Sequence, residues 1–423
     1  MQKEFRMKVV GIIAEYNPFH NGHQYQIDQI RKLTGADYIV VIMSGNFLER
    51  GVPAIVDKYT RAKMALNGGA DLILELPALW ATASAERFAE AGVMLLASTG
   101  VVDTICYGAE QPNAALSQQI VSLLTHHAFD NEEIFQLQKQ GFTYPAARAQ
   151  VLSRLLPAYD PQTILSFLSS PNNILGLEYE RAIAKWNAIH TQPICGQSIQ
   201  RIGGGYHDET LHPDFSSATA IRTLLLNSSP EEIPASLRLQ VPPCIYETLT
   251  DALCHNELLD IDDFSDALYA RLWSYRTIGY TQFADCNIEL SNKIANTLDQ
   301  YISFRDFAGL LKTREVTYTR VCRVLTHILL DIRKEDYTAY TPDTSYLRIL
   351  GFRRLASPLL AAIKKEAALP LITKMADASS FLSAQANALL SRDIATADLY
   401  RSIHSIHRGQ TLPNEFTQPI VIL

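Results

Sequence analysis

Cysteine is scarce in this sequence, with six residues in a chain of 423. No two of them are spaced as Cys-x-x-Cys, so the chain has neither the cysteine density of a small disulfide-stabilised domain nor the spacing of a zinc ribbon. Reduced and mostly buried thiols are expected. At roughly 100–200 residues per domain, this length predicts two or three domains with a large core.

Long apolar runs are also absent. No stretch approaches the ~18–20 residues that span a bilayer, and the apolar segment Val9–Ala14 is too short for the core of a signal peptide. We therefore expect a soluble protein of the cytoplasm. The sequence also lacks Gly-x-x-x-x-Gly-Lys-Ser/Thr, which excludes a Walker-type ATPase.

Positive charge is in deficit overall but is unevenly distributed. The net charge is −7, yet the region from Arg305 to Lys365 contains twelve Lys or Arg and six Asp or Glu, a local balance of +6. The rest of the chain therefore carries −13. An acidic body with a basic region is compatible with a nucleic-acid partner. A solvated basic helix face is the alternative.

Short apolar segments alternate with helical patterns in the first quarter of the chain. Buried strands are expected at 8–14, 37–43, 71–76 and 103–107. Helices are expected between them at 24–33, 57–66 and 81–97. Continuous apolar strands that alternate with helices are typical of parallel βαβ units in a sheet covered on both faces. The sequence therefore predicts a doubly wound α/β domain.

The pattern changes after Pro242-Pro243. Before this point we expect helices at 117–156 and 177–189, a strand at 194–201, and a capped helix start within 216–226. After it, residues 245–405 space their apolar side chains with the helical period and show few strand signals. We predict two domains: an α/β domain over 1–240 and a mostly α-helical domain over 241–423.

The segment with the clearest chemical meaning directly follows the first expected strand and reads EYNPFHNGH, from Glu15 to His23. Two imidazoles spaced as His-x-Gly-His in a strand-to-helix turn can face one point, and Gly22 lets the backbone approach a ligand. The amides at the start of the following helix suit a phosphate. Histidines there can donate hydrogen bonds to phosphoryl oxygens during an in-line displacement. We predict that His20 and His23 are catalytic; two ordinary surface histidines are the alternative.

This strand, turn and helix resemble the nucleotidyltransferases of the HIGH superfamily, Rossmann-like (HUP-type) enzymes that bind ATP and attack its α-phosphate. Those enzymes often have a second motif, a Ser/Thr-rich helix start, and this chain offers Ser216–Arg222. Hydroxyls and amides at Ser217 and Thr219 would hold the β- and γ-phosphates, and Arg222 would neutralise the leaving pyrophosphate. A plain capped helix is the alternative.

Additional motifs make the sequence similar to one family within this superfamily, the tRNA(Met) cytidine acetate ligases. These motifs are MSGNF at 43–47 with Arg50-Gly51, YGAE at 107–110, SPNNILGLEY at 170–179, RIGGGYHD at 201–208 and SSATAIR at 216–222. The resemblance implies that ATP and acetate form acetyl-adenylate with release of pyrophosphate. The acetyl group would then pass to N4 of the wobble cytidine of elongator tRNA(Met), forming N4-acetylcytidine.

Transferred motif by motif, the resemblance implies an ATP site in the region 13–26 and at four later motifs. Its predicted residues are Ile13, Ala14, Glu15, Tyr16, Asn17, Pro18, Phe19, His20, Asn21, Gly22, His23, Gly108, Asn172, Asn173, Arg201, Ile202, Ser217, Thr219 and Arg222. No carboxylate cluster in the motif region suggests a dedicated metal site. We therefore expect Mg²⁺ to be bound through the phosphates of ATP.

The basic region and one long loop are the expected contacts with tRNA. Predicted tRNA-binding residues are Lys312, Arg314, Arg320, Arg323, Arg353 and Arg354. Loop 44–58 is long for a connection between a strand and a helix. We expect Ser44, Gly45 and Asn46 near the mouth of the ATP pocket, and Arg50 and Lys58 within reach of tRNA or of the phosphates. A loop with only a structural role, whose charged side chains face solvent, is equally compatible with the sequence.

Two other functions share part of this pattern. A small-molecule adenylyltransferase that makes a dinucleotide from ATP would use the same His-x-Gly-His chemistry, but it would leave the long basic helical region unexplained. An RNA-binding scaffold with a vestigial nucleotide pocket would explain that region, but it need not keep His20, Gly22 and His23 intact. Labelled ATP, acetate and tRNA would distinguish the three, because the products differ.

Overall fold

The structure, a computed structural model, describes residues 7–125, 131–140, 142, 144–202, 216–229 and 235–423. The glycine run at 203–205 lies outside the described residues. An eight-stranded mixed sheet forms the centre, with strand order β5-β4-β1-β2-β3-β6-β7 and with β8 paired to β6 outside this path. The strands are β1 Val9–Ala14, β2 Tyr38–Ser44, β3 Leu72–Leu76, β4 Thr104–Ala109, β5 Cys195–Gln200, β6 Leu347–Phe352, β7 Leu371–Ile372 and β8 Val421–Ile422.

The first five strands are parallel and have the order of a Rossmann-like sheet. Strand β1 pairs with β2 on one side and with β4 on the other. The chain therefore builds outward from β1 in one direction through β2 and β3, and then in the opposite direction through β4 and β5. Open α/β sheets bind ligands at the carboxyl ends of the strands where this reversal occurs. The α/β fold predicted from the sequence is confirmed, and it places a crevice between β1 and β4.

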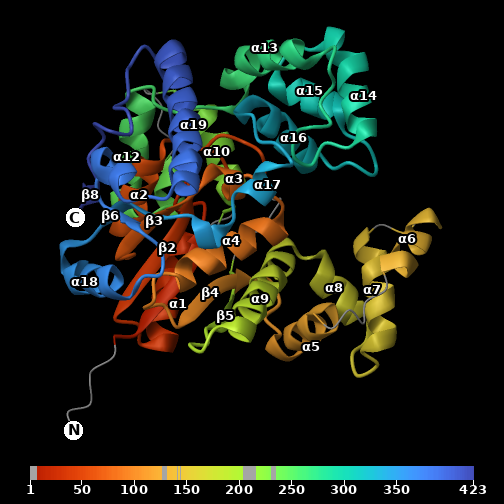
Figure 1. The fold of residues 1–423 in the computed structure, drawn as a ribbon, viewed down its shortest axis with the longest axis horizontal. Coiled ribbons are helices and arrows are strands. Elements are labelled where there is room, and N and C mark those ends of the chain that lie inside the picture. Colours follow the sequence, from red (N-terminus) through yellow and green to blue (C-terminus); the bar gives the residue numbers. More distant parts are fainter. Residues whose placement is uncertain (1–6, 126–130, 141, 143, 203–215, 230–234) are drawn as a thin grey trace.

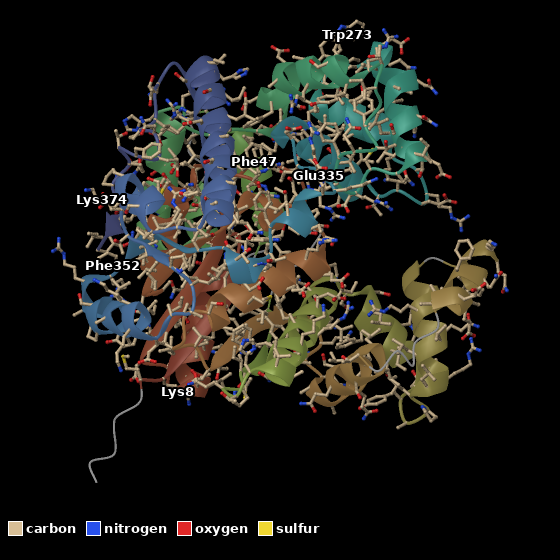
Figure 2. All side chains as sticks on the ribbon, in the orientation of Figure 1. Lys8, Phe47, Trp273, Glu335, Phe352 and Lys374 are labelled. Atoms are coloured by element: carbon tan, nitrogen blue, oxygen red, sulfur yellow. The ribbon has the colours of Figure 1, made fainter. Side chains whose placement is uncertain are left out.

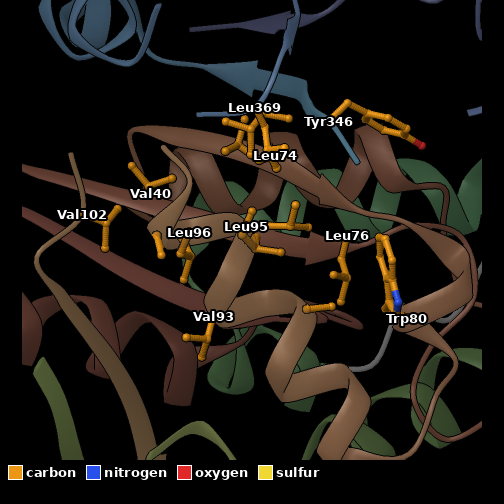
Figure 3. Close-up of a cluster of buried hydrophobic side chains, with 14 of the residues drawn as sticks. Val40, Leu74, Leu76, Trp80, Val93, Leu95, Leu96, Val102, Tyr346 and Leu369 are labelled. Carbon is orange, nitrogen blue, oxygen red and sulfur yellow. The ribbon is translucent and has the colours of Figure 1, made fainter. Parts of the chain in front are cut away.

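Helices cover both faces of this sheet (Figure 1). On one face, α4 and α9, together with α18 and α19 from the end of the chain, pack over a core that includes Val40, Leu74 and Leu96 (Figure 3). On the other face, α1, α2, α10 and α12 cover a core that includes Val41 and Ile221. These helices are α1 Asn21–Thr34, α2 Lys58–Asn67, α4 Ala85–Ala97, α9 Pro171–Ile189, α10 Ala218–Leu226, α12 Pro243–Cys254, α18 Ser357–Glu366 and α19 Ala384–Arg408.

Two groups of helices project from this body in Figure 1. The first consists of α13 Ser265–Tyr275, α14 Ile288–Thr297, α15 Phe304–Leu311 and α16 Tyr318–Leu330, and we call it the helical module. Its core also includes Phe47 of loop 44–58 and Tyr400 of α19, so that loop is anchored in the module (Figure 2). The second consists of α5 Ala114–Thr125, α6 Asn131–Lys139, α7 Tyr144–Leu155 and α8 Pro161–Ser169, with small cores of its own.

Three further α-helices of the described chain are short: α3 Ala78–Ala81, α11 Ala235–Gln240 and α17 Asp336–Ala339. The expectation of a mostly helical region after residue 240 holds for α12 to α19. Strands β6, β7 and β8 are the exceptions: β6 pairs antiparallel with β3, and β7 and β8 both pair with β6. Part of the later region thus completes the first sheet, and the division at 240/241 stays a prediction. Among the described residues, no helix is long and apolar enough to cross a membrane.

Candidate active site

His20 and His23 lie at the junction of β1 and α1, where their side chains cap the helix. Nδ1 of His20 accepts a hydrogen bond from the Gly22 N–H at 3.0 Å, and Nδ1 of His23 accepts one from the His20 N–H at 3.3 Å. The two rings stack with their centroids 3.8 Å apart. The pair therefore forms a capping box, a reciprocal arrangement that satisfies two amides at the helix start and orients both rings.

These hydrogen bonds decide which ring nitrogen carries the proton. An imidazole nitrogen that accepts a hydrogen bond is unprotonated, so the neutral ring carries its proton on the other nitrogen, Nε2. Burial, with Arg201 and Arg222 nearby, lowers the pKa of His20 to about 3. Burial, with His20 and Arg201 nearby, also lowers the pKa of His23 well below its usual value. Both rings are thus neutral near pH 7, and each offers an Nε2–H donor.

Gly22 provides the space that this arrangement needs. A Cβ atom at position 22 would lie 2.8 Å from Cε1 and 3.0 Å from Nδ1 of the His20 ring. Tyr16 supports the other ring, with its own ring edge-on to His23 at a centroid distance of 4.8 Å. The backbone of Tyr16 has a φ of 48°, so the chain turns sharply after β1. Any larger residue at position 22 would displace His20 from the cap.

We predict that His20 stays neutral to about pH 4 in the protein without ligands. Its pKa of about 3 in the folded state lies below the unfolded value near 6.5. The unfolded state therefore binds more protons between these values, so His20 contributes stability above pH 6.5 that is lost as the pH falls toward 3. Nitrogen-15 NMR of labelled histidine measures both charge and tautomer, with the urea-unfolded chain as the reference. Titration of His20 near pH 6.5 in the folded protein would contradict the assignment.

A cavity of about 180 Å³ opens beside the two histidines, at the carboxyl ends of β1 and β4. It brings together most of the residues predicted for ATP, namely Ile13, Ala14, Glu15, Tyr16, Asn17, His20, His23, Gly108, Asn172, Arg201, Ser217, Thr219 and Arg222. Gln26 of the same motif region also lines it. Segments far apart in the sequence therefore converge on the crevice that the strand order creates.

Four predicted residues line neither this cavity nor the recess beside it. Phe19 is buried against Gly68, where a Cβ atom would come within 2.3 Å of its ring. Pro18 is buried in the same turn. The Asn21 side chain donates a hydrogen bond to the Leu239 carbonyl, and Asn173 accepts one from the Gln111 N–H at 3.1 Å. Gly22 and Ile202 line a small recess next to the cavity. His20 and Arg201 line both the recess and the cavity.

Helix α10 contributes the second motif. Ser217 is its N-cap, with the side chain accepting from the Ala220 N–H. Arg222 donates to the Asn17 carbonyl at 2.7 Å and to the Thr219 hydroxyl at 3.1 Å. The guanidinium group therefore links α10 to the turn that holds the histidines. Ser217 thus caps a helix and also lines the cavity, and its contact with phosphates stays a prediction.

Glu110 organises the opposite wall at the start of α9. Its carboxylate accepts hydrogen bonds from the Asn172 side chain at 2.6 Å and from the Asn173 N–H at 3.1 Å. Gly108 lies beside Arg201, whose Cγ would be 3.1 Å from a Cβ atom at position 108. One of the two N–H donors of the Asn172 amide is thus used by Glu110, which leaves the second N–H and the carbonyl oxygen to contact a base edge.

Several wall residues are not among those predicted for the ATP site, although all but Phe88 lie in loop 44–58 or in a motif noted in the sequence. They are Leu48, Glu49, Val52, Phe88, Tyr107, Leu175, Tyr179 and Ala218. Leu175 and Tyr179 follow Asn172 at helical spacing, so the pattern SPNNILGLEY contains the signal for them. The Glu49 N–H donates to the Glu15 carboxylate at 2.8 Å, and the Glu49 carboxylate forms an ion pair with Arg323 at 3.0 Å. Burial raises the pKa of Glu49, and Glu15 adds to this effect while Arg323 opposes it.

Loop 44–58 contributes to the cavity, but most of the loop residues that line it are not the ones we expected. Leu48 to Arg50 and Val52 line the ATP cavity, whereas Ser44, Gly45 and Asn46 do not. The prediction for Lys58 was wrong, because its side chain is buried and forms ion pairs with Glu75 at 2.7 Å and Glu415 at 2.8 Å. Local sequence gave no sign of these acidic partners, one of which lies in the C-terminal tail.

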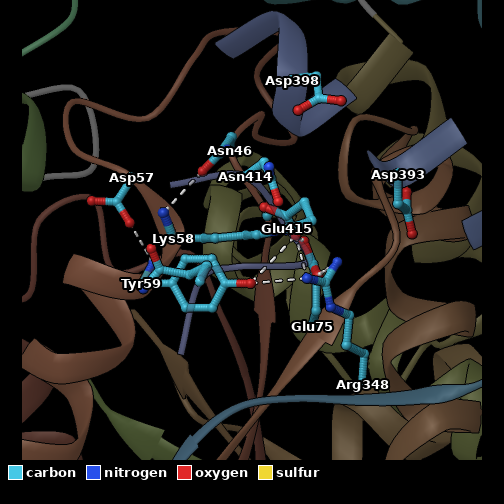
Figure 4. Close-up of polar contacts among 12 residues, drawn as sticks. Asn46, Asp57, Lys58, Tyr59, Glu75, Arg348, Asp393, Asp398, Asn414 and Glu415 are labelled. Atoms are coloured by element: carbon cyan, nitrogen blue, oxygen red, sulfur yellow. Dashed lines mark hydrogen bonds and ion pairs between the residues drawn. The ribbon is translucent and has the colours of Figure 1, made fainter. Parts of the chain in front are cut away.

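Lys58 belongs to a buried ionic network that joins four parts of the chain (Figure 4). Arg348 of β6 pairs with Glu75 at 3.0 Å and also with Glu415, and it donates to the Tyr59 hydroxyl at 2.9 Å. Burial alone would raise the pKa of Glu415, but Lys58 and Arg348 outweigh it and lower that pKa to about 2. The network fixes β6 and the tail against α2 and β3.

The residues predicted to bind tRNA do not form one patch. Lys312 and Arg314 are exposed in the helical module, and Arg320 donates to the Asp285 carbonyl at 3.4 Å. Arg323 is mostly buried between Glu49 and Asp285. Arg353 and Arg354 follow β6, where the Arg353 N–H donates to Asp71 at the amino end of β3. They therefore lie at the opposite edge of the sheet from the cavity, and a role for the whole set in tRNA binding stays a prediction.

Comparison with known proteins covers nearly the whole chain. A family model described as HIGH Nucleotidyl Transferase matches residues 7–413. The tRNA(Met) cytidine acetate ligase of Acetivibrio thermocellus is 34% identical over 425 residues, covering 99% of this chain and 100% of the relative. The enzyme of the same name from Lysinibacillus sphaericus is 34% identical, covering 98% of this chain and 99% of the relative.

Solved structures agree with these sequence matches. A crystal structure of Thermotoga maritima TmcAL in its apo form superposes with a TM-score of 0.89 at 28% identity, covering 99% of this chain and 100% of that one. A second crystal form of TmcAL, bound with alpha-thio ATP, gives a TM-score of 0.86 at the same identity and coverage. The similarity therefore extends through the helical module as well as the sheet.

Proposed function

This chain belongs to the HIGH nucleotidyl transferase family and, within it, to the tRNA(Met) cytidine acetate ligases, and from this membership we infer its reaction. It is an ATP-dependent ligase that activates acetate as acetyl-adenylate, releases pyrophosphate, and transfers the acetyl group to N4 of the wobble cytidine of tRNA(Met). We place it in the cytoplasm, where ATP and tRNA are available.

The observation that carries this proposal is the pair of neutral, capped histidines facing one cavity at the β1–β4 crevice. We propose that their Nε2–H groups donate to the α-phosphate of ATP as the acetate oxygen attacks it. Because these donors are already in place, they stabilise the negative charge of the transition state without first having to move. Such preorganised donors are a main source of electrostatic rate enhancement in enzymes. Arg222, held by Asn17 and Thr219, would receive the leaving pyrophosphate.

The remaining assignments follow from the position of each residue in the wall. We propose that Gly108, which has no side chain to block the approach, lies against the adenosine and that the Asn172 carbonyl accepts from the base edge. Arg201, beside Gly108, would contribute positive charge to the phosphates. The walls of the cavity would also shield acetyl-adenylate from water until tRNA arrives.

We predict that adenylation depends on Mg²⁺ bound through the phosphates of ATP. Among the described residues, no group of three His, Cys, Asp or Glu side chains is placed to hold a metal ion. Mg²⁺ commonly keeps several of its waters and binds through substrate phosphates, so the phosphates of ATP can hold it without a cluster of protein ligands. EDTA should reduce acetyl-adenylate formation at least about tenfold, and added Mg²⁺ should restore it. Full synthesis in EDTA would refute the proposal.

One incubation tests the function as a whole. The protein is mixed with labelled ATP, labelled acetate and unmodified tRNA(Met), and the nucleosides are analysed by mass spectrometry. N4-acetylcytidine together with AMP and pyrophosphate is expected. A dinucleotide would identify the chain as a small-molecule adenylyltransferase, and the absence of any product would leave only an RNA-binding role.

A further inference from the structure

A second cavity, of about 390 Å³, adjoins the candidate active site, and we call it the adjoining cavity. Four residues line both cavities: Arg50 and Val52 of loop 44–58, and Thr219 and Arg222 of α10. The two cavities therefore share a wall. Because Arg222 is bonded to the Asn17 carbonyl in the histidine turn, this wall lies at the phosphate end of the proposed ATP site.

The rest of the adjoining cavity is built by loop 44–58, α10, the helical module and the segment that leads into that module. Its other lining residues are Pro53, Ile55, Thr223, Leu226, Leu259, Asp260, Ile261, Arg305, Tyr318 and Thr319. Arg305 stands at the start of α15 and pairs with Asp260 and with Asp262. Tyr318 and Thr319 begin α16. The adjoining cavity thus lies where the nucleotide-binding sheet meets the helical module.

The lining combines groups that suit one class of ligand. Val52, Ile55 and Leu259 give an apolar surface, and the half-buried Tyr318 adds an aromatic ring. Unpaired bases bind by stacking on aromatic side chains, with arginines contacting the sugar-phosphate backbone. Arg50 lies at the shared wall, where its guanidinium group can make such a contact. The recess on the other side of His20, about 30 Å³, is much smaller.

We propose that the adjoining cavity receives the single-stranded pyrimidine nucleotide whose amine attacks acetyl-adenylate, with its base against Tyr318. This assignment rests on the proposed function. The amine nitrogen forms a bond to the acetyl carbon, and the bond from that carbon to the phosphate oxygen breaks. AMP leaves with the electron pair, and the nitrogen gives one proton to water. Entry at the shared wall brings the amine to the phosphate end, where the acetyl group is attached.

Thr223→Trp tests this assignment, because Thr223 is exposed on α10 and lines the adjoining cavity without lining the ATP cavity. The indole would occupy space meant for the base. Acetate-dependent ATP–pyrophosphate exchange should stay within about twofold of wild type, whereas acetyl transfer at saturating tRNA should fall about 100-fold. Thr191→Trp, at an exposed threonine between α9 and β5, is the matched control and should leave both rates unchanged.

A second pair of variants tests the aromatic contact. Tyr318→Phe keeps the ring and should transfer acetyl at nearly the wild-type rate, whereas Tyr318→Ala should lower transfer about tenfold relative to exchange. Normal transfer by both Thr223→Trp and Tyr318→Ala would overturn the assignment. Loss of exchange in Thr223→Trp would also overturn it, because the adjoining cavity would then belong to the ATP site. If the wild-type protein exchanges pyrophosphate but never acetylates tRNA, the proposed function fails instead.

Discussion

Replacing His20 with alanine is expected to lower the rate of acetyl-adenylate formation about 10²–10³-fold. The ring is the only part of His20 that can donate into the cavity, and its Nε2–H is fixed there by the bond between Nδ1 and the Gly22 N–H. His23→Ala should have an effect of the same size, since the two rings are oriented by one capping box. Acetate-dependent pyrophosphate release measures the rate.

A loss of rate in His20→Ala could also reflect damage to the start of α1, so a second variant is needed. His20→Asn keeps an acceptor for the Gly22 N–H, because asparagine is a good N-cap residue, but it removes the donor that reaches the cavity. It should therefore fold like the wild type and still lose activity. His255→Ala, at an exposed histidine that directly follows α12, is the control for the substitution itself. Wild-type pyrophosphate release in His20→Asn would remove the catalytic assignment.

Replacing Arg348 with methionine is expected to destabilise the protein by about 3–5 kcal/mol. Methionine matches part of the side-chain volume but cannot pair with Glu75 or Glu415, so two buried carboxylates would share the single charge of Lys58. Removing one partner of a buried network costs more than the network contributes as a whole, because an uncompensated charge stays in the interior. Urea unfolding monitored by circular dichroism gives the change.

Arg354→Met is the matched control, because Arg354 is exposed shortly after the same strand. A surface substitution of this kind usually changes stability by less than about 0.5 kcal/mol. If Arg348→Met unfolds at the same urea concentration as Arg354→Met, the network does not hold β6 and the tail to the sheet. Adenylation should survive in the folded fraction of either variant, since neither residue lines the ATP cavity.

The parts of the site that could be predicted from the sequence are those that local chemistry dictates. An apolar β-branched strand followed by a polar turn and a helix fixes where His20 and His23 must lie, and the structure has this arrangement. Asp57 and Ser217 cap α2 and α10 as their positions before apolar helical patterns suggest. These features depend on neighbours within one turn of helix, which periodicity and capping rules describe.

Contacts between distant segments could not be predicted in the same way. Strand β6 completes the sheet beside β3, and its partner is not apparent from its own six residues. Lys58 and Arg323 looked like solvent-facing cations, yet each is paired with carboxylates from other segments. A single sequence gives the charge of a side chain but not the acidic group that the fold places next to it. The same reason explains why Glu49 was not predicted as a wall residue.

In the proposed reaction, acetate attacks the α-phosphate of ATP in the cavity beside His20 and His23. Acetate labelled with oxygen-18 in both carboxylate oxygens tests it most directly. If acetyl-adenylate forms and its acetyl group is then transferred to tRNA, one labelled oxygen stays on the phosphate, and mass spectrometry should find AMP heavier by one oxygen-18. His20→Asn should produce this AMP at the reduced rate. Unlabelled AMP, or label in inorganic phosphate released alongside ADP, would contradict the account.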